Sequence, residues 1–146
     1  MAAISGITDG EILSSVRTKL NNVITEINLL DPTDWIDYTN SATIVGWSAA
    51  GFTKSLKYRV VGKQVFVLYY LAGTSNSTST TFTLPLTPIN DQLLLSYSAN
   101  AGSYAPNSFI LFSSGVTTVT CYQNNSTTWG STNTKQVIGQ VFYQIA

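Results

Sequence analysis

The sequence predicts a mainly β protein, in which an N-terminal coiled-coil α-helix precedes an antiparallel, jelly-roll-like β-sandwich and the chains assemble as a homotrimer. A strict heptad repeat lies near the N-terminus, and short apolar runs alternate with turn residues over the remainder. Ser (17) and Thr (20) supply 37 of the 146 residues, whereas only 10% are charged, against about 25% in ordinary domains. Thr and aromatic residues favour strands. We therefore divide the chain into an N-terminal peptide (1–8), a helix (9–31) and a β-domain (32–146).

The helix is expected to start at a capping box, Thr8-Asp-Gly-Glu11, and to end at Asp31-Pro32, because proline disfavours the α conformation of the residue before it. Leu or Ile at the a positions with mainly β-branched residues at the d positions disfavours a parallel dimer, and we prefer a trimer to a tetramer. The alternative is an amphipathic helix packed on its own domain, which usually carries a wider apolar stripe. The trimerisation residues are those that recur in steps of three and four: Leu13, Val16, Leu20, Val23, Ile27 and Leu30.

Eight short segments after Trp35 have strand composition and are bounded by Gly, Pro, Asn or Ser. This number of strands in about 110 residues predicts a sandwich or jelly roll. Gly62-Lys63 separates two of them and predicts a hairpin. The expected strands are Thr43–Trp47, Ser55–Val61, Gln64–Ala72, Thr80–Leu84, Gln92–Ser98, Asn107–Phe112, Val116–Tyr122 and Val137–Ile145.

The segment Gln64–Ala72 is apolar on both faces, whereas a strand of an antiparallel sandwich usually turns one face to water. Two explanations stay open. The strand is central, with a loop over its second face, or that face is a subunit interface.

The composition excludes most catalytic chemistry. The chain has no His and a single Cys, Cys121, so it lacks His-based acid–base pairs, disulfides within the chain and Cys or His metal clusters. Asp91 is the only carboxylate expected within the β-domain proper, and we interpret Asp31, Asp34 and Asp37 as solvated linker residues rather than Ca²⁺ ligands. We therefore predict no enzyme activity, no cofactor and no metal.

The charge and apolar patterns also bear on partners. Seven basic residues balance seven acidic ones, which disfavours a nucleic-acid partner. The longest apolar run, Val65–Ala72, is too short to span a membrane as a helix, and the N-terminus has no secretion-signal pattern. We therefore expect no membrane partner and assembly inside a cell.

The order of a short peptide, a trimerising helix and a Ser/Thr/Asn-rich β-domain resembles bacteriophage fibre and spike proteins. The stretches Asp34-Trp-Ile-Asp-Tyr-Thr-Asn, Ile44-Val-Gly-Trp47, Lys57-Tyr-Arg-Val-Val-Gly-Lys-Gln-Val-Phe-Val and Leu71-Ala-Gly-Thr-Ser-Asn-Ser-Thr-Ser-Thr-Thr-Phe-Thr-Leu-Pro85 look like the β-head domain of phage fibre and appendage proteins. Ser14-Ser-Val-Arg-Thr-Lys-Leu-Asn also looks like the helical start of phage structural proteins.

This resemblance implies a homotrimer in the virion, assembled in the host cytoplasm, anchored to a capsid or tail protein and presenting a knob to the host surface. Head and tail locations both stay open, as does a purely decorative capsid protein. Residues 1–8 would be the attachment peptide, with Ile4 and Ile7 seated in a groove of the virion partner.

Aromatic residues in Gly/Ser/Asn/Thr-rich segments are candidates for contact with a host glycan or protein, because exposed rings stack on sugar faces or form interface hot spots. These residues are Tyr104, Tyr122 and Trp129. The alternatives are that they cover the end of the sandwich, or that the domain is a carbohydrate-binding module. Trp35 and Trp47 are expected to be structural, sealing the junction of helix and β-domain.

Overall fold

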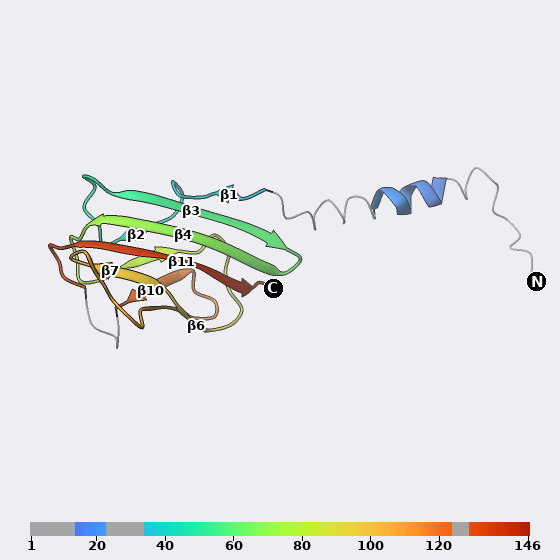
Figure 1. Cartoon of the computed structure of the whole chain (residues 1–146). Helices are drawn as coiled ribbons and strands as arrows, with labels where there is room; N and C mark the ends of the chain where they lie inside the picture. The colour runs from blue at the N-terminus through green and yellow to red at the C-terminus, as the bar shows by residue number, and fades with distance from the viewer. Residues whose placement is uncertain (1–13, 23–33, 124–128) are drawn as a thin grey trace, which may run out of the picture.

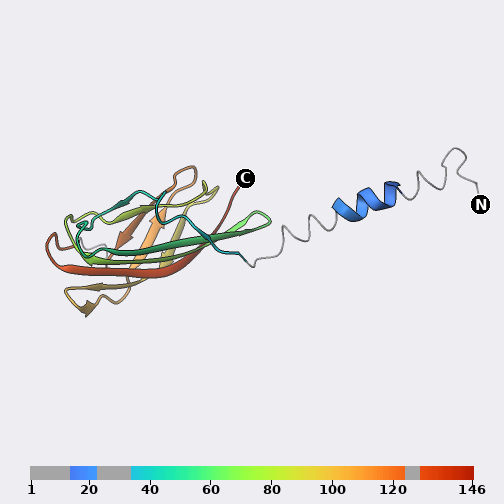
Figure 2. The same cartoon turned by 90° about the horizontal axis from the view of Figure 1, so that it is seen from above.

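The computed structural model describes residues 14–22, 34–123 and 129–146. The described residues after 34 form two antiparallel β-sheets, which lie as two layers (Figures 1 and 2). The prediction of a mainly β protein built as a sandwich is confirmed.

Sheet A carries the longest strands. Its order is β1 (Ile36–Asp37), β3 (Thr53–Val61), β4 (Gln64–Thr74), β11 (Thr134–Gln144), β7 (Tyr97–Asn100) and β8 (Ser103–Tyr104). β4 and β11 pair along their full lengths at the centre of this sheet. β11 covers most of Val137–Ile145, which the sequence predicts as a strand.

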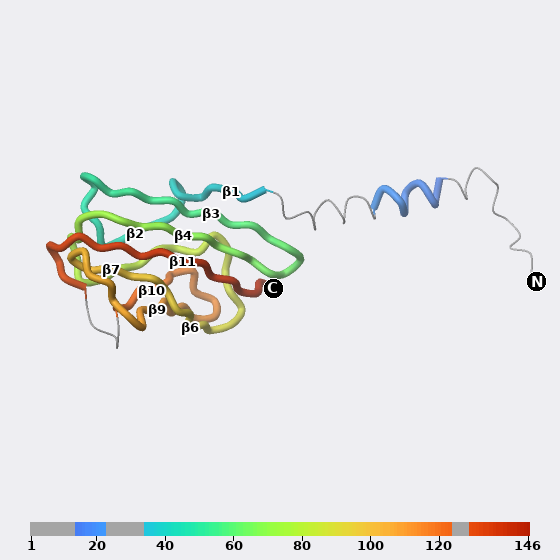
Figure 3. The backbone as a smooth tube through the Cα atoms, viewed as in Figure 1, coloured from blue at the N-terminus to red at the C-terminus, as the bar shows by residue number. Residues whose placement is uncertain are grey.

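Sheet B is built from shorter strands. Its order is β2 (Ile44–Val45), β5 (Thr81–Thr83), β10 (Thr118–Tyr122), β9 (Phe109–Phe112) and β6 (Gln92–Leu95), and Figure 3 traces β10, β9 and β6 through the lower part of the domain. The two-residue strands β1 and β8 have no counterpart among the strands expected from the sequence, because two residues give no measurable alternation.

The predicted hairpin is present as β3 and β4, which are joined by Gly62 and Lys63. Gly62 has a φ of 59°, which suits the first central position of a tight two-residue turn. Alternation then sends the odd-numbered residues of β4 to the inner face, where Val65, Val67 and Leu71 are fully buried.

The core lies between the two sheets, and aromatic pairs link them. Tyr69 of sheet A lies 5.1 Å from Phe82 of sheet B, and Tyr143 of sheet A lies 5.7 Å from Phe112 of sheet B, both measured between ring centroids. All four rings are almost completely buried. Among the described residues, every member of this core lies within the β-domain.

One predicted strand is wrong. The segment Gln92–Ser98 is divided at Ser96 into β6 of sheet B and β7 of sheet A. The Ser96 amide donates to the Ser108 carbonyl at 2.9 Å, and its hydroxyl accepts from the Tyr69 hydroxyl at 3.0 Å. These bonds hold the residue at which the chain crosses between layers, and composition alone gives no sign of such a crossing.

The sandwich has two ends, which we call proximal and distal according to their distance from residue 34, where the described β-domain begins. The proximal end holds the β3–β4 turn, Trp35 and the C-terminus, and Ile145 donates its amide to the Lys63 carbonyl there (Figure 1). The distal end holds the start of β3 and the end of β4. Trp47 is buried at the distal end, where it bridges Ser75. Trp47 is structural, as expected, but it does not seal the helix junction, because the chain crosses the length of the sandwich between Ile36 and Trp47.

Residues 14–22 are helical and every one of them is exposed. Within the predicted helix 9–31, residues 9–13 and 23–31 lie outside the described residues. The proposed seam is thus described only at Val16 and Leu20, and Leu13, Val23, Ile27 and Leu30 are not covered.

Candidate functional site

Asp37 and Asp91 accept local hydrogen bonds, and Cys121 is buried in the core. Hydrogen bonds from Thr39 hold the pKa of Asp37 below its usual value, and Asp91 accepts a 2.6 Å bond from the Ser114 amide. Burial raises the pKa of Cys121 to about 12, which keeps it a thiol. Among residues 14–22, 34–123 and 129–146 there is no cluster of three or more His, Cys, Asp or Glu that could hold a metal ion.

The outer face of sheet A carries two depressions. The strand register aligns its outward residues in rows that cross the sheet. The aromatic ridge is one such row, made of Tyr70 on β4, Ile138 on β11 and Tyr97 on β7. The next row toward the distal end contains Ala72, Gln136 and Ala99 in the same strands. Small side chains in this second row leave a depression beside the ridge.

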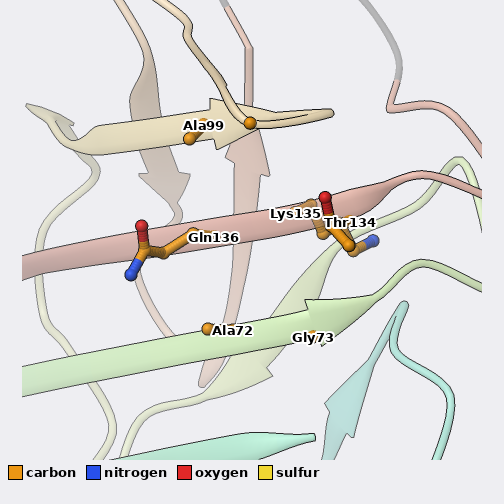
Figure 4. Close-up of a pocket in the computed structure, with 7 residues that line it drawn as sticks. Ala72, Gly73, Ala99, Thr134, Lys135 and Gln136 are labelled. Carbon is orange, nitrogen blue, oxygen red and sulfur yellow. The ribbon is translucent and has the colours of Figure 1, made fainter. Parts of the chain in front are cut away.

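This depression, the distal hollow, has a volume of about 240 Å³. Figure 4 shows Thr134 and Gln136 on β11 between Ala72 and Gly73 on β4 and Ala99 on β7. Its lining residues are Ala72, Gly73, Ala99, Gly102, Thr134, Lys135 and Gln136. The groups that rise from this lining are therefore mostly methyl groups, one hydroxyl and one amide.

Lys135 contributes no ammonium group to the outer face. Its Nζ atom donates to Thr80 Oγ1 at 2.6 Å, and it lies 4.5 Å from the ring centroid of Trp47 and 5.5 Å from that of Trp129. Burial lowers the pKa of Lys135 to about 8. The two indole faces attract the cationic form, so this lysine belongs to the core at the distal end.

A central hollow of about 300 Å³ lies on the other side of the aromatic ridge. Its lining residues are Ser55, Lys57, Leu68, Tyr69, Tyr70, Ile138 and Gly139. The Tyr70 hydroxyl accepts a 3.1 Å bond from Gln136 Nε2, which fixes the amide of the distal hollow against the ridge. The ridge thus separates two neighbouring depressions on one face.

The outer face changes character toward the proximal end. The Arg59 guanidinium lies 5.0 Å from the Trp35 ring and 5.2 Å from the Phe66 ring. Phe66 pairs in register with Phe142, whose side chain is 48% exposed. This region combines aromatic rings with the Arg59 cation, and its residues line neither hollow.

The sequence predicts that the aromatic side chain of Tyr104 is exposed, and the structure agrees. It is 59% exposed and stacks on Tyr97, with 5.3 Å between ring centroids. The β7–β8 hairpin brings the two rings together, and Ala101 and Gly102 in its turn have φ values of 51° and 76°. Tyr104 lies in the row of Gln136 and Ala99, at the edge of the sheet, and its ring stacks on the Tyr97 end of the aromatic ridge.

The other two predicted contact residues lie elsewhere. Trp129 is only 2% exposed, and its Nε1 donates to the Cys121 carbonyl at 2.9 Å. Its ring is part of the core beside Lys135, so the structure corrects the expectation that Trp129 is a surface contact. Tyr122 is half-buried on sheet B, stacked on Phe109 with 4.9 Å between ring centroids. The three residues do not form one site.

Sequence reasoning missed the residues that shape the outer face, namely Tyr97, Gln136 and the row of alanines. The one signal was the two-sided apolar character of β4, whose outward residues Phe66, Leu68 and Tyr70 are only partly buried in the single chain. Apart from Gly102, the residues that line the two hollows all lie on strands. The predicted attachment residues Ile4 and Ile7 lie outside the described residues.

Comparisons with protein-family models, curated proteins and solved structures found no match to this chain. In the part of the chain that the structure describes, no helix combines the length and apolarity needed to cross a membrane.

Proposed function

We propose that the chain is a structural protein of a bacteriophage virion: a homotrimeric fibre, assembled in the host cytoplasm, that presents a jelly-roll-like β-knob for adhesion to the host surface. Residues 1–8 would attach it to a capsid or tail protein, and residues 9–31 would form the trimerising coiled coil. The proposal involves no catalysis and no cofactor.

The observation that carries the proposal is the exposure of the helix seam. Val16 and Leu20 occupy d and a positions of the heptads, and each is 56% exposed in the single chain. A helix of about 20 residues is only marginally stable alone in water, and its stability comes from packing of its apolar side. Copies of the same helix supply that packing when they bury these side chains as knobs in holes.

The geometry of the β-domain agrees with a presenting role. Residue 34 and the C-terminus lie at the proximal end, whereas the distal hollow lies at the ends of β4 and β7 (Figure 1). An anchor attached through the N-terminal segment would leave the distal end facing outward.

Molar mass in solution, measured by light scattering after size exclusion, tests the trimer. We expect the full chain to have three times its 15.8 kDa mass. Leu20→Asp would place three like charges in one buried layer, and unpaired buried charges cost several kcal/mol, so this variant is expected to dissociate. Asn22→Asp adds the same charge two residues away, off the seam, and should stay trimeric.

A monomeric full chain would contradict the proposal. A trimeric Leu20→Asp variant would instead show that the sandwich holds the oligomer, and the fragment 31–146, which keeps the whole described core, would then have to be trimeric too.

The attachment role has its own test. Deleting residues 1–7 is expected to abolish incorporation into virions while the trimer remains intact, because the heptads begin later in the chain. Incorporation is measured by blotting purified particles from cells that express the truncated protein. Normal incorporation would show that attachment lies elsewhere.

A further inference from the structure

We propose that the outer face of sheet A binds a neutral glycan, with one sugar ring seated in the distal hollow beside the aromatic ridge. This inference rests on the adhesive role proposed above and names the class of partner, but it does not depend on the number of copies in the assembly.

The shape of the distal hollow suits a small ring. The hollow exists because Ala72 and Ala99 flank Gln136 in one cross-strand row, whereas the next row carries Tyr70, Ile138 and Tyr97. Its volume of about 240 Å³ is below the roughly 300 Å³ at which drug-sized pockets begin. The central hollow lies just across the ridge, so a chain of linked rings can continue over Tyr70 into it.

The chemistry of the lining favours a ligand that is hydroxylated but uncharged. The distal hollow offers the Thr134 hydroxyl and the Gln136 amide, and the ammonium of Lys135 is bonded to Thr80 in the core. An ionic ligand would lose water there without gaining a counter-charge. A purely apolar ligand would cover the hydroxyl and amide and leave them without hydrogen bonds. A saccharide has both C–H faces and hydroxyl groups, so it satisfies both kinds of surface.

The aromatic pair supplies the flat surface on which a sugar ring stacks. Tyr97 and Tyr104 are 48% and 59% exposed, and they are already stacked on each other. Aromatic rings lose little conformational entropy on binding, and pre-stacked rings lose less. Gln136 is held in place by its bond to Tyr70, so the polar contact is also set before binding.

A peptide strand fits this place poorly. The ladder of sheet A already uses the main-chain groups of β4, β11 and β7 on both sides of Gln136. Strand addition needs a free sheet edge, and the edges of this sheet are β1 and β8. Recognition in the distal hollow must therefore come from side chains.

The test is an array of neutral oligosaccharides probed with the full chain, followed by titration calorimetry with each of cellotetraose, maltotetraose and tetra-N-acetylchitotetraose. We expect binding of at least one neutral oligosaccharide in the millimolar to micromolar range. The affinity should be unchanged at an ionic strength of about 1 M, where the Debye length is only about 3 Å. If no neutral oligosaccharide binds, the proposal is overturned.

Matched variants locate the site. Tyr97→Ala and Gln136→Ala should each weaken binding about tenfold, the equivalent of about 1.4 kcal/mol. Phe142→Ala is the control, because Phe142 is also an aromatic residue of this outer face and is equally exposed, at 48%, but it lies opposite Phe66, away from the rows that hold Tyr97 and Gln136. Ala99→Leu fills the distal hollow without removing a contact and should abolish binding. Unfolding curves for all four variants establish that they are folded.

Equal loss of affinity in Tyr97→Ala and Phe142→Ala, or full affinity in a folded Ala99→Leu, would overturn the assignment to this face. A fall in the molar mass of Tyr97→Ala would also overturn it, because the face would then be an interface between copies. A trimer that binds no glycan refutes this inference alone, and a monomer that binds glycan through Tyr97 and Gln136 refutes the trimeric fibre alone.

Discussion

The two faces of β4 are both apolar, yet one is buried and the other is partly exposed. On the inner face, Val65, Val67 and Leu71 are completely buried under sheet B. On the outer face, Leu68 is 38% exposed. The hydrophobic effect rewards the removal of apolar area from water wherever a partner exists, and the single described chain supplies sheet B as a partner for one face only. Apolar composition therefore does not by itself distinguish a core from a binding surface.

Adjacent tyrosines give the sharpest test of this difference. Tyr69 points inward against Phe82, whereas Tyr70 points outward on the aromatic ridge. Tyr69→Ala removes a buried ring and is expected to lower the free energy of unfolding by about 3–5 kcal/mol. Tyr70→Ala should lower it by less than about 1.5 kcal/mol, the value of one ordinary hydrogen bond, because its ring is partly exposed. Chemical denaturation measures both, and equal losses would show that the outer face is buried in solution.

A glycine on the inner face of β11 tests how tightly that face is packed. A Cβ atom added at Gly139 would collide with the Tyr69 hydroxyl and lie 2.8 Å from its Cζ. Gly139→Ala is expected to destabilise the protein by about 1–3 kcal/mol through overpacking. Combining it with Tyr69→Phe removes the colliding oxygen, so the double variant should be more stable than the two single effects predict. Strict additivity in the denaturation midpoints would contradict this packing.

Lys135 is a charged residue on the inner face, and the pH dependence of the free energy of unfolding tests its burial. Its pKa is lowered by burial from 10.5 to about 8, so above pH 8 the unfolded chain binds more protons than the folded one. By linkage, its contribution to the free energy of unfolding rises with pH, by about 1 kcal/mol between pH 7 and pH 9. Above pH 9, Cys121 acts in the opposite direction, because burial raises its pKa to about 12.

The measurement compares denaturation of the parent chain with that of Lys135→Met at both pH values. The rise should disappear in Lys135→Met, since the thioether has no proton to lose. Lys54→Met removes an exposed lysine and serves as the control. A parent chain and a Lys135→Met variant with the same pH dependence would show that the ammonium is not held in the core as described.

The smallest expected effect lies at the edge of the outer face. Ala101 has a φ of 51° in the β7–β8 turn, a conformation that alanine disfavours and asparagine tolerates. Ala101→Asn creates an Asn-Gly turn with Gly102, the pair preferred where two successive residues have positive φ. We expect stabilisation of up to about 1 kcal/mol, seen as a higher melting temperature. A lower melting temperature would argue against this turn.

Sequence reasoning predicted the local features and missed the long-range ones. The β3–β4 hairpin is evident from two apolar runs around Gly62, because a tight turn is specified by its own residues. The division of the predicted strand at Ser96 is not evident from the sequence, because it depends on where the second sheet lies. The burial of Trp129 likewise depends on the approach of Lys135 and Cys121 from other strands.

By itself, the sequence determined a chain of mostly uncharged strands, a heptad-patterned segment ahead of them and a strand apolar on both faces. These features follow from composition and from periods of two and three to four residues, which are local properties. Only the tertiary structure decided which face of β4 is covered and which residues meet across the strands. Ala72, Gln136, Ala99 and Tyr104 form one row through registers that join β4, β11, β7 and β8. Pairing of strands so distant in sequence is fixed by the packing of two whole sheets against each other, and no local pattern encodes it.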